Sequence, residues 1–521
     1  MAAGAVAVVG ETAGYAHLVD PTRKWYNNWR IFSLNGWIVL LLITSSNFGY
    51  DGSMMNGLQS LPQWESSFNT PQGSSLGLLN AIQSIGSLAA YPFVPYLADG
   101  IGRRPTIFFG AVIMCGAVAL QTASSSVHMF IGARFLIGFG LTFPQNAAPM
   151  LITEVAYPPH RAQLTSLYMC LWYSGSIVAA WSTYGSFRIK NSWAWRLPSL
   201  LQGIPAFLQI FLVLFAPESP RWLVSKNRET QALSTLAYYH ADGNEQDPLV
   251  QYEYQEIRAA YELDRTIATN VGWKSLYKTP GNRRRMRIII ALAVFSQWSG
   301  NGLVSSYLSK VFNAIGITDS LTQLLINGIL QIWNLAVSMS SAFLVERIGR
   351  RILFIASCIG MLVFFTTQTV CSAVFAKTQN ESAAHSVIAF IFLFSAAYDI
   401  AFTPLIVSYT VEILPYNIRS KGLDVSNFIA SIAIIFNQYI NPIALEHIAW
   451  RYYIVYCCWL VVELGFCWLY VVETKGLSLE ETAALFDGED AVEQIATMKV
   501  GDDMHEDHDN EKKSDSVHST S

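Results

Sequence analysis

The chain has 521 residues, of which 52% are hydrophobic and 13% are charged, and its formal net charge is −4. A soluble domain normally carries about 25% charged residues, so this composition excludes an ordinary soluble globular fold and indicates lipid as the solvent. The small net charge gives no indication of a nucleic-acid partner.

Long apolar runs follow one another along the chain. About 20 apolar residues are enough to cross the hydrocarbon core as a helix, and the sequence contains twelve such runs. The first half predicts spans near 33–58, 76–97, 105–125, 129–150, 164–185 and 197–216, and the second half near 288–312, 321–345, 352–376, 386–411, 423–445 and 452–472. Twelve spans place both ends of the chain on one side of the membrane.

The segments beside the spans define the expected domains. These are an N-terminal segment at 1–30, a six-helix bundle at 31–216, a linker with short helices at 217–287, a second six-helix bundle at 288–472 and a tail at 473–521. The tail is polar and nearly free of aromatics from about 487, which predicts disorder there. Most of the 33 Lys and Arg residues lie at the ends, in the linker and in the loops on that same side, which predicts that this side is cytoplasmic.

Three further features of the sequence are local. The basic run at 283–287 indicates a positive anchor for the seventh span, with a lipid-headgroup contact as the alternative. Asn380 begins an N-glycosylation sequon in a loop predicted on the outer side, so it is a candidate glycosylation site. The seven cysteines lie in apolar runs without metal-ligand spacing, so neither a metal nor a cofactor is predicted.

The two halves carry the same charged motifs in the same order. Each half has an acidic residue and a Gly-Arg-Arg string after its second span, a Glu seven residues before an Arg between its fourth and fifth spans, and a Glu after its sixth. These residues are Asp99, Arg103, Arg104, Glu154, Arg161 and Glu218 in the first half, and Glu346, Arg350, Arg351, Glu412, Arg419 and Glu473 in the second. A duplicated six-span unit is typical of a secondary transporter whose halves move about a central site.

Taken together, these motifs resemble the sugar porter family of the major facilitator superfamily over about residues 29–486. Two shorter strings, at 297–307 and 437–442, resemble the fungal branch of lactose and cellodextrin permeases. The resemblance implies an all-α fold of twelve transmembrane helices in two pseudo-symmetric six-helix bundles that work by alternating access.

The resemblance assigns the twelve charged motif residues to an inner gate. Their carboxylates and arginines are expected to pair across the two bundles only while the inner side is closed, which can bias a two-state equilibrium. The alternative is that they only fix the topology. The Pro that usually precedes the final Glu-Thr-Lys-Gly of the family is Val472 here, which is expected to loosen the exit from the last span.

Two ionisable residues lie deep within the first and fourth spans. Counting about 1.5 Å per residue places both Asp51 and Arg134 roughly 30 Å from the inner ends of their spans. An ionisable residue at such depth is a functional hypothesis by default. In the family, an Asp in a Phe-Gly-Tyr-Asp string takes up the symported proton and an Arg on the fourth span modulates it, which the resemblance carries to Asp51 and Arg134. A static buried ion pair is the alternative.

Several polar residues lie near the predicted midplane, where transporters bind their substrates. Gln297 and Asn334 match the sugar-binding amides of the family, and amides suit sugars because they both donate and accept hydrogen bonds. Amides that only join helices are the alternative. The full set of candidate substrate residues is Ser176, Gln297, Asn301, Tyr307, Asn334 and Asp399.

Small side chains replace large ones in this predicted pocket. Ser176 stands where hexose-type relatives carry a Gln, and Ser296 replaces the first of their paired Gln residues. These replacements are expected to weaken monosaccharide binding and to leave room for a second sugar ring. Asp399 is expected to accept a further hydroxyl, with a gate or a structural role as the alternative.

The sequence thus predicts a proton–sugar symporter of a fungal plasma membrane, with a disaccharide such as lactose or cellobiose as the substrate. Its partners would be the sugar, the proton and the lipid bilayer, and one chain would be sufficient. A monosaccharide, a polyol or a glycosylated secondary metabolite is the nearest alternative substrate. A sugar receptor that does not transport is a rival function. A membrane enzyme is not supported, because no catalytic triad, metal site or phosphate site lies near the midplane.

Overall fold

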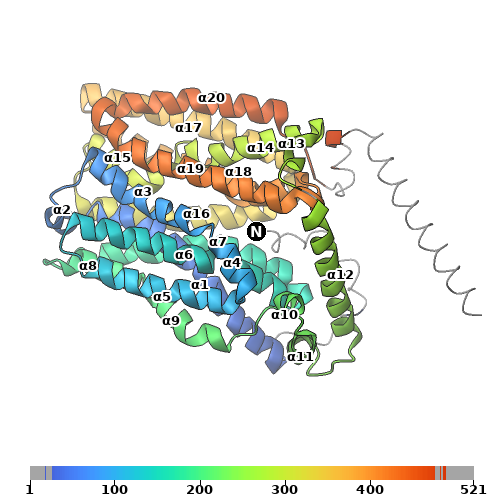
Figure 1. The fold of residues 1–521 in the computed structure, drawn as a ribbon. Helices are drawn as coiled ribbons and strands as arrows, with labels where there is room; N and C mark the ends of the chain where they lie inside the picture. The colour runs from blue at the N-terminus through green and yellow to red at the C-terminus, as the bar shows by residue number, and fades with distance from the viewer. Residues whose placement is uncertain (1–17, 19–25, 271, 476–481, 483–484, 488–521) are drawn as a thin grey trace, which may run out of the picture.

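The computed structural model describes residues 26–270 and 272–475, together with 18, 482 and 485–487; within these ranges, the side chains of a few helical residues, Glu346 among them, are left undescribed. The tail predicted to be disordered from about 487 lies almost entirely outside the described residues. The fold is a set of long helices that run side by side (Figure 1).

The first half contributes α1 and α3–α9. Their bounds are α1 Trp29–Leu58, α3 Gly73–Ala90, α4 Val94–Gly100, α5 Arg103–Thr122, α6 Val127–Val155, α7 Pro158–Ser186, α8 Trp193–Leu201 and α9 Ile204–Leu212, with a 3₁₀ turn η3 at Val213–Phe215 and a short loop helix α2 at Pro62–Ser67. Each of the six predicted spans of this half coincides with one of these helices or with a consecutive pair.

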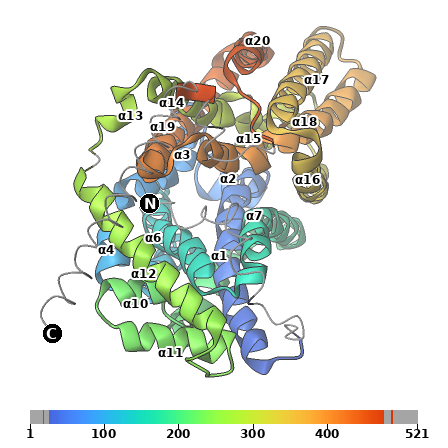
Figure 2. The ribbon, with the colours of Figure 1, turned by 90° about the vertical axis from the view of Figure 1, so that its right-hand side faces the viewer.

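The second half repeats this arrangement. Its helices are α14 Pro280–Trp298, α15 Asn301–Ala314, α16 Ser320–Ile348, α17 Arg350–Thr378, α18 Glu381–Ile413, α19 Tyr416–Ile448 and α20 Tyr452–Tyr470, with a 3₁₀ turn η4 at Ala449–Arg451. The two halves form separate bundles, with α14–α20 above and α1–α9 below in the end-on view (Figure 2). The predicted all-α fold of two six-helix bundles is confirmed.

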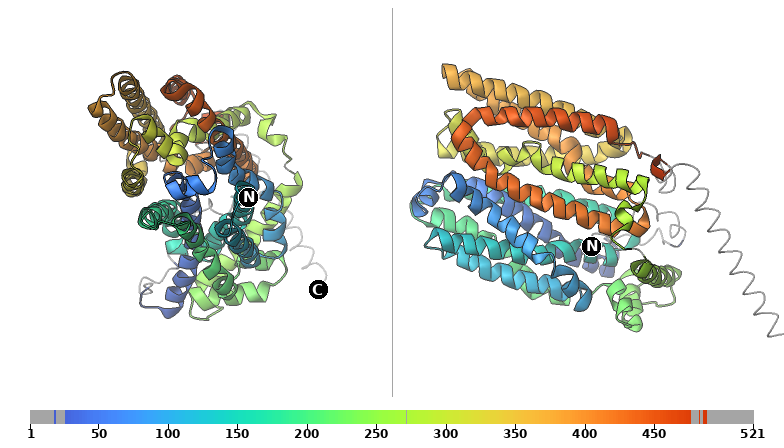
Figure 3. Two further views of the ribbon diagram at one scale, coloured as in Figure 1. Left: turned by 90° about the vertical axis from the view of Figure 1, so that its left-hand side faces the viewer. Right: turned by 45° about the horizontal axis from the view of Figure 1, so that its top comes forward.

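Four helices of the linker gather at one end of the molecule, here termed the linker side (Figures 1 and 3). They are α10 Pro220–Ser225, α11 Glu229–His240, α12 Pro248–Asn270 and α13 Ser275–Lys278. The opposite end, which carries α2 and the start of α8, is termed the far side.

Nine segments of the described chain are long and apolar enough to cross a membrane, and one of them, Lys421–Tyr470, contains α20 and all of α19 except its first turn. The helices α3 and α7 are absent from this set. Both helices pack at the junction of the bundles, α3 against α6 and α19, and α7 against α1 and α16. A helix enclosed by other helices does not need the apolar surface of one that faces lipid, which explains the lower hydropathy of α3. Several side chains of α7 lie outside the described part of the structure, so its absence from the set says nothing about its hydropathy.

The helices α1 and α7 approach closely because small residues meet between them. A Cβ atom added at Gly175 would lie 1.7 Å from the carbonyl oxygen of Ser46, and one added at Gly49 would lie 1.7 Å from that of Trp172. Only glycine permits this spacing, as is usual where membrane helices touch through small residues. The close contact fixes the position of α1, which carries Asp51.

The basic run in the first turns of α14 is more than a surface anchor. Arg285 is fully buried and donates to both carboxylate oxygens of Asp487 at 3.1 and 2.7 Å, and its guanidinium lies 4.8 Å from the ring centroid of Phe486. The short piece at 485–487 therefore folds back onto the start of α14, and Arg285 serves this contact.

Candidate functional site

Asp51 of α1 and Arg134 of α6 form an ion pair inside the first bundle. Asp51 Oδ1 lies 3.6 Å from Arg134 Nη1, and the two side chains are 0% and 2% exposed. Arg134 is held from behind by α3, because its Nε donates to the Leu79 carbonyl at 2.9 Å and its Nη2 donates to the Gln83 side chain. The sequence predicted these two residues at similar depth, and the structure brings them together.

Gln202 is a third member of this site that the sequence analysis missed. It lies between α8 and α9, and its Nε2 donates to Asp51 Oδ1 at 2.6 Å. The second carboxylate oxygen, Oδ2, is buried and has no hydrogen-bond partner. The available signal was a lone Gln beside a Gly within the apolar run at 197–216. The arrangement leaves one carboxylate oxygen of Asp51 ready to carry a proton.

Two of the predicted sugar amides flank an interruption between α14 and α15. Gln297 lies one residue before the end of α14, and Asn301 begins α15. Asn301 Nδ2 donates to the Ser296 carbonyl at 3.2 Å, whereas its Oδ1 is buried without a hydrogen-bond partner. Asn334 on α16 also has a buried Oδ1 without a partner. Unfilled amide acceptors are what a polyhydroxylated ligand requires.

Tyr307 lies at the bend in α15 and packs in a cluster of buried residues that belong mostly to the first bundle. Its φ of −136° bends α15, its side chain is fully buried, and its hydroxyl donates to the Gln438 carbonyl of α19. Arg134 of the other bundle is among the charged groups near it. Tyr307 thus connects the bend in α15 with the neighbourhood of the ion pair.

Asp399 bridges the two bundles. Its Oδ1 accepts from the Tyr173 hydroxyl of α7 at 2.5 Å and from the Thr403 hydroxyl of its own helix at 2.6 Å, and the residue is 1% exposed. Its Oδ2 is buried without a hydrogen-bond partner. Only this second oxygen is available to a ligand, so the arrangement favours the structural alternative to a sugar acceptor.

Ser176 does not face a pocket between the bundles, which corrects the expectation from the sequence. Its hydroxyl donates to the Gly49 carbonyl of α1 at 2.9 Å, and the residue is fully buried. The direction of Ser176 follows from the close packing of α1 on α7, because Gly175 beside it meets α1 directly. The argument that Ser176 makes room for a second sugar ring therefore loses its structural basis.

The charged motifs form matching ion pairs inside each bundle. Arg103 Nε lies 3.2 Å from Glu154 Oε2 between α5 and α6, and Arg350 Nη2 lies 2.9 Å from Glu412 Oε1 between α17 and α18. Asp99 Oδ1 is 3.4 Å from Arg103 Nη1. These pairs join helices of the same bundle, so pairing across the bundles stays a prediction for another conformation.

Glu218 and Glu473 cap helices at equivalent positions. Glu218 accepts from the backbone N–H groups of Arg103 and Arg104 at 3.2 and 3.3 Å, and Glu473 accepts from those of Arg350 and Arg351 at 2.8 and 3.0 Å. A carboxylate at a helix N-terminus satisfies free N–H groups and complements the helix dipole. Burial raises the pKa of the Glu218 carboxyl, and these N–H donors oppose the shift.

The remaining motif residues differ between the halves. Arg161 Nη2 lies 3.5 Å from Glu253 Oε1 of α12, which ties α7 to the linker. His240 Nδ1 also lies 2.7 Å from Glu253 Oε2. Arg419 donates from Nε to the Leu414 carbonyl at 3.3 Å. The side chain of Glu346 is outside the described part of the structure.

Polar contacts that the sequence analysis missed join the bundles on the far side. Asn56 of α1 donates to the Val304 carbonyl at 3.3 Å and accepts from the Leu308 N–H at 3.1 Å. Gln59 donates to the Ser306 carbonyl at 2.9 Å. The bend at Tyr307 frees these backbone groups of α15, and side chains of the first bundle satisfy them. Asn56 and Gln59 are therefore termed the far-side latch.

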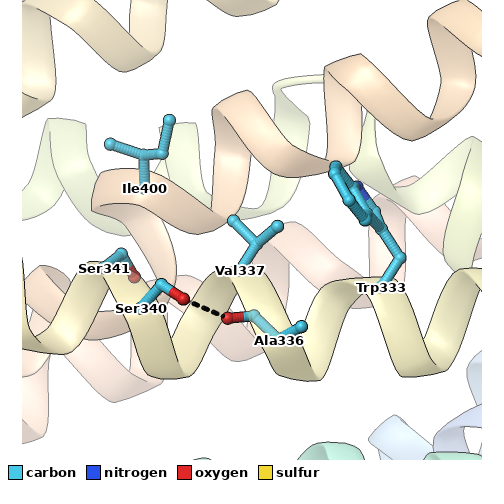
Figure 4. A pocket seen from close by; sticks show the side chains of 6 residues that line it. All are labelled: Trp333, Ala336, Val337, Ser340, Ser341 and Ile400. Atoms are coloured by element: carbon cyan, nitrogen blue, oxygen red, sulfur yellow. Dashed lines mark hydrogen bonds between the residues drawn. The ribbon is translucent and has the colours of Figure 1, made fainter.

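Two surface features complete the map. Asn380 is exposed at the start of α18, on the far side, and its side chain caps the helix by accepting from Ser382 N–H at 2.9 Å. A groove of about 280 Å³ lies between α16 and α18 (Figure 4). Its walls carry none of the predicted substrate residues; they consist of Trp333, Ala336, Val337, Ser340, Ser341 and Ile400.

Comparisons with known proteins agree with this architecture. A family model described as "Sugar (and other) transporter" matches residues 37–486. The chain is 26% identical over 450 residues to the MFS-type transporter criB of Aspergillus cristatus, covering 86% of this chain and 92% of that protein. It is 26% identical over 459 residues to a high-affinity glucose transporter of Kluyveromyces lactis, covering 84% and 82%. The inward-open structure of the xylose transporter XylE from E. coli superimposes with a TM-score of 0.72 at 24% identity, covering 87% of this chain and all of that one.

Proposed function

The chain belongs to the Sugar (and other) transporter family, and from that premise we propose that this membrane-embedded sugar transporter moves its substrate together with protons. Members of this family are transporters and not enzymes. The observation that carries the proposal is the buried carboxyl of Asp51, which has Arg134 and Gln202 on one oxygen and no hydrogen-bond partner on the other. A buried carboxyl that alternates between a charged, paired form and a neutral form is a means of proton coupling.

Coupling between proton binding and the movement of the bundles follows from the neighbours of the Asp51–Arg134 pair. Arg134 is held by α3, which packs against α19 of the second bundle. Protonation of Asp51 would neutralise its charge and release Arg134 from the pair. The altered charge would then act on the contact between the bundles, including Tyr307, which lies near Arg134. This sequence of effects supports alternating access driven by a proton.

The sugar is proposed to bind between the bundles, next to the α14–α15 interruption. Gln297, Asn301 and Asn334 would supply the amides, and two of them have buried carbonyl oxygens without hydrogen-bond partners. Tyr307 would close the far side over the sugar. Asp399 would contribute its second oxygen, while its first holds Tyr173. One chain contains every proposed contact, so a monomer is sufficient.

The described conformation is inferred to be open toward the linker side. The far-side latch joins α1 to the bend in α15, and Gly77 of α3 packs directly on the Tyr439 carbonyl of α19 near the same end. On the linker side, the described ion pairs of the charged motifs lie within single bundles or between α7 and the linker. The Lys and Arg distribution supports a cytoplasmic linker side, with both termini there.

The identity of the sugar is a finer proposal. The strings at 297–307 and 437–442 support a disaccharide such as lactose or cellobiose through their resemblance to fungal permeases. The K. lactis relative is named for glucose, and Ser176 no longer favours the larger substrate because it packs on α1. A monosaccharide is therefore the alternative substrate.

Uptake into proteoliposomes tests the proposal. Labelled glucose, xylose, lactose and cellobiose would each be offered with and without an inward proton gradient. Accumulation above equilibrium that requires the gradient supports symport. If the sugar only equilibrates, at a rate independent of the proton gradient, the protein works by facilitated diffusion and not by symport. Binding of sugar without any flux would favour a receptor.

A further inference from the structure

A second buried carboxyl lies in the other bundle, at the interruption between α14 and α15. Glu463 of α20 is fully buried, and its Oε1 and Oε2 lie 3.2 and 3.1 Å from the hydroxyl oxygen of Ser299. Ser299 and Gly300 are the two residues between the helices, and Gly300 has a φ of +98°, which favours glycine. The carboxyl of Glu463 thus touches the point where one membrane helix is broken.

The titratable groups around Glu463 offer no positive charge. They are Cys467 on its own helix, Cys358 on α17 and Tyr398 on α18, while α14 contributes the Ser299 hydroxyl. Among the described residues, none of the ion pairs includes Glu463. An ionised carboxylate in such a place is costly, so the neutral acid is the stable form in this conformation.

The hydrogen bonds of Ser299 agree with a neutral acid. Its hydroxyl also contacts the Phe295 carbonyl, at hydrogen-bond distance. A carbonyl only accepts, and serine has a single hydroxyl hydrogen. When that hydrogen points to Phe295, the hydrogen between Ser299 and Glu463 must come from the carboxyl. In that arrangement, the Glu463 proton is donated to Ser299 and the Ser299 hydrogen to the last turn of α14, which makes the three groups a relay.

Loss of the proton would reverse this relay. The Ser299 hydrogen would turn to the carboxylate, and the Phe295 carbonyl would keep only the Ser299 N–H, at 3.2 Å. The next two carbonyls of α14 are held by neighbours of the predicted sugar site. The Ser296 carbonyl accepts from Asn301 at 3.2 Å and from Tyr398 at 2.7 Å, and the Gln297 carbonyl accepts from Asn437. A change in the hydrogen bonding of Ser299 thus alters the end of α14, between the predicted sugar residues Gln297 and Asn301.

We propose that Glu463 is a second proton-binding site, separate from Asp51, whose occupancy sets the hydrogen bonding at the end of α14. Proton binding converts the carboxylate to the acid and adds one hydrogen bond to the Phe295 carbonyl. The link to sugar transport rests on the proposed function, because it uses the sugar amides assigned there. The proton site itself does not depend on that assignment.

Infrared spectroscopy of the full-length protein in liposomes, recorded as a difference between acidic and alkaline pH, tests the site. The carbonyl stretch of a protonated carboxylic acid is the readout, and no sugar is needed. We expect an acid band that is lost in Glu463→Gln and kept in Asp51→Asn. Ser299→Ala should keep the band but shift its frequency, because the acid loses its acceptor. If no pH-dependent band is lost in Glu463→Gln, the carboxyl does not exchange a proton and the proposal is overturned. An unshifted band in Ser299→Ala would overturn the relay.

Counterflow of labelled sugar tests the link to transport. The Asp51→Asn protein should retain a pH-dependent exchange rate, and the double variant Asp51→Asn/Glu463→Gln should not. A pH-independent rate in Asp51→Asn alone would overturn the link. The proposed function fails on a different result, namely that the wild-type protein does not concentrate sugar under a proton gradient. The infrared assignment of Glu463 does not depend on that result.

Discussion

Asn56 of α1 and Leu308 of α15 are joined by a hydrogen bond of 3.1 Å between the bundles, with the Asn56 Oδ1 accepting from the backbone N–H. The same amide donates to the Val304 carbonyl at 3.3 Å. One side chain of the first bundle therefore satisfies the donor and the acceptor that the bend at Tyr307 releases in the second. This contact joins the two bundles in the described conformation, so its strength is expected to contribute to the balance between conformations.

Asn56→Leu is expected to shift the protein toward the conformation that is open on the far side. The substitution leaves buried backbone groups of α15 unsatisfied, which costs about 1–3 kcal/mol, and about 1.4 kcal/mol changes a population ratio tenfold. Spin labels on the far-side ends of α3 and α19 would report the distance between the bundles. Asn191→Leu, at an exposed loop residue on the same side, is the control. Unchanged distances in Asn56→Leu would show that the latch does not influence the equilibrium.

Asp51→Asn is expected to abolish accumulation of sugar against a gradient while sugar counterflow continues. The amide keeps the size of the side chain and can still bond to Gln202, but it cannot exchange a proton. Uptake and counterflow would be measured in the same proteoliposomes under an inward proton gradient. A variant that still concentrates sugar would assign the proton to another group, and the pair with Arg134 would then be static.

Gly175→Ala is expected to prevent stable folding of the first bundle. The new methyl group would lie 1.7 Å from the Ser46 carbonyl oxygen, and the backbone of α1 cannot move that far without losing its packing. Gly185→Ala is a matched control on the same helix, because an added Cβ there has no atom within 4 Å. Yield of monodisperse protein and the thermal midpoint in detergent would separate the two. Equal behaviour of both variants would contradict the close approach of α1 and α7.

Arg103→Ala is expected to lower the free energy of unfolding by about 3–5 kcal/mol, because Glu154 would remain buried without its partner. The two side chains are only 9% and 5% exposed. The comparison is Arg258→Ala, which removes a pair with Glu229 whose members are 50% and 45% exposed. Such surface pairs contribute at most about 1 kcal/mol. Denaturation in detergent micelles measures the free energy of unfolding of both variants. A similar loss of stability in the two would show that the Arg103–Glu154 pair has no special structural role.

Gln297→Ala is expected to lower kcat/KM for the transported sugar by about 10- to 200-fold. Sugars that are not substrates should be unaffected. Ser176→Gln should instead reduce uptake of monosaccharides and disaccharides alike, since the larger side chain would disrupt the contact with Gly49. Kinetic constants for glucose and cellobiose would be compared in both variants. A selective loss of cellobiose in Ser176→Gln would restore the predicted pocket for a second ring.

The sequence by itself determined the order of the long apolar helices, the duplication and the relative depth of the ionisable residues. Apolar runs of about 20 residues leave little choice in a bilayer, because every backbone group must be bonded within a helix. Depth follows from a constant rise of 1.5 Å per residue, so Asp51 and Arg134 could be placed at one level. The repeated motifs likewise predicted equivalent positions in each half, and Arg103 with Glu154 and Arg350 with Glu412 form equivalent pairs.

Only the tertiary structure decided which way each side chain points. Successive residues of a helix turn by about 100°, so correct depth does not distinguish a pocket from a helix contact. Ser176 lies at the predicted level but faces α1. Asn56, Gln202 and Glu463 are single polar residues in apolar runs, a pattern that does not predict a partner. Their partners lie on other helices, between 127 and 252 residues away in the sequence. Which of them meet depends on the rotation and crossing of the helices, and that is set by packing across the whole fold.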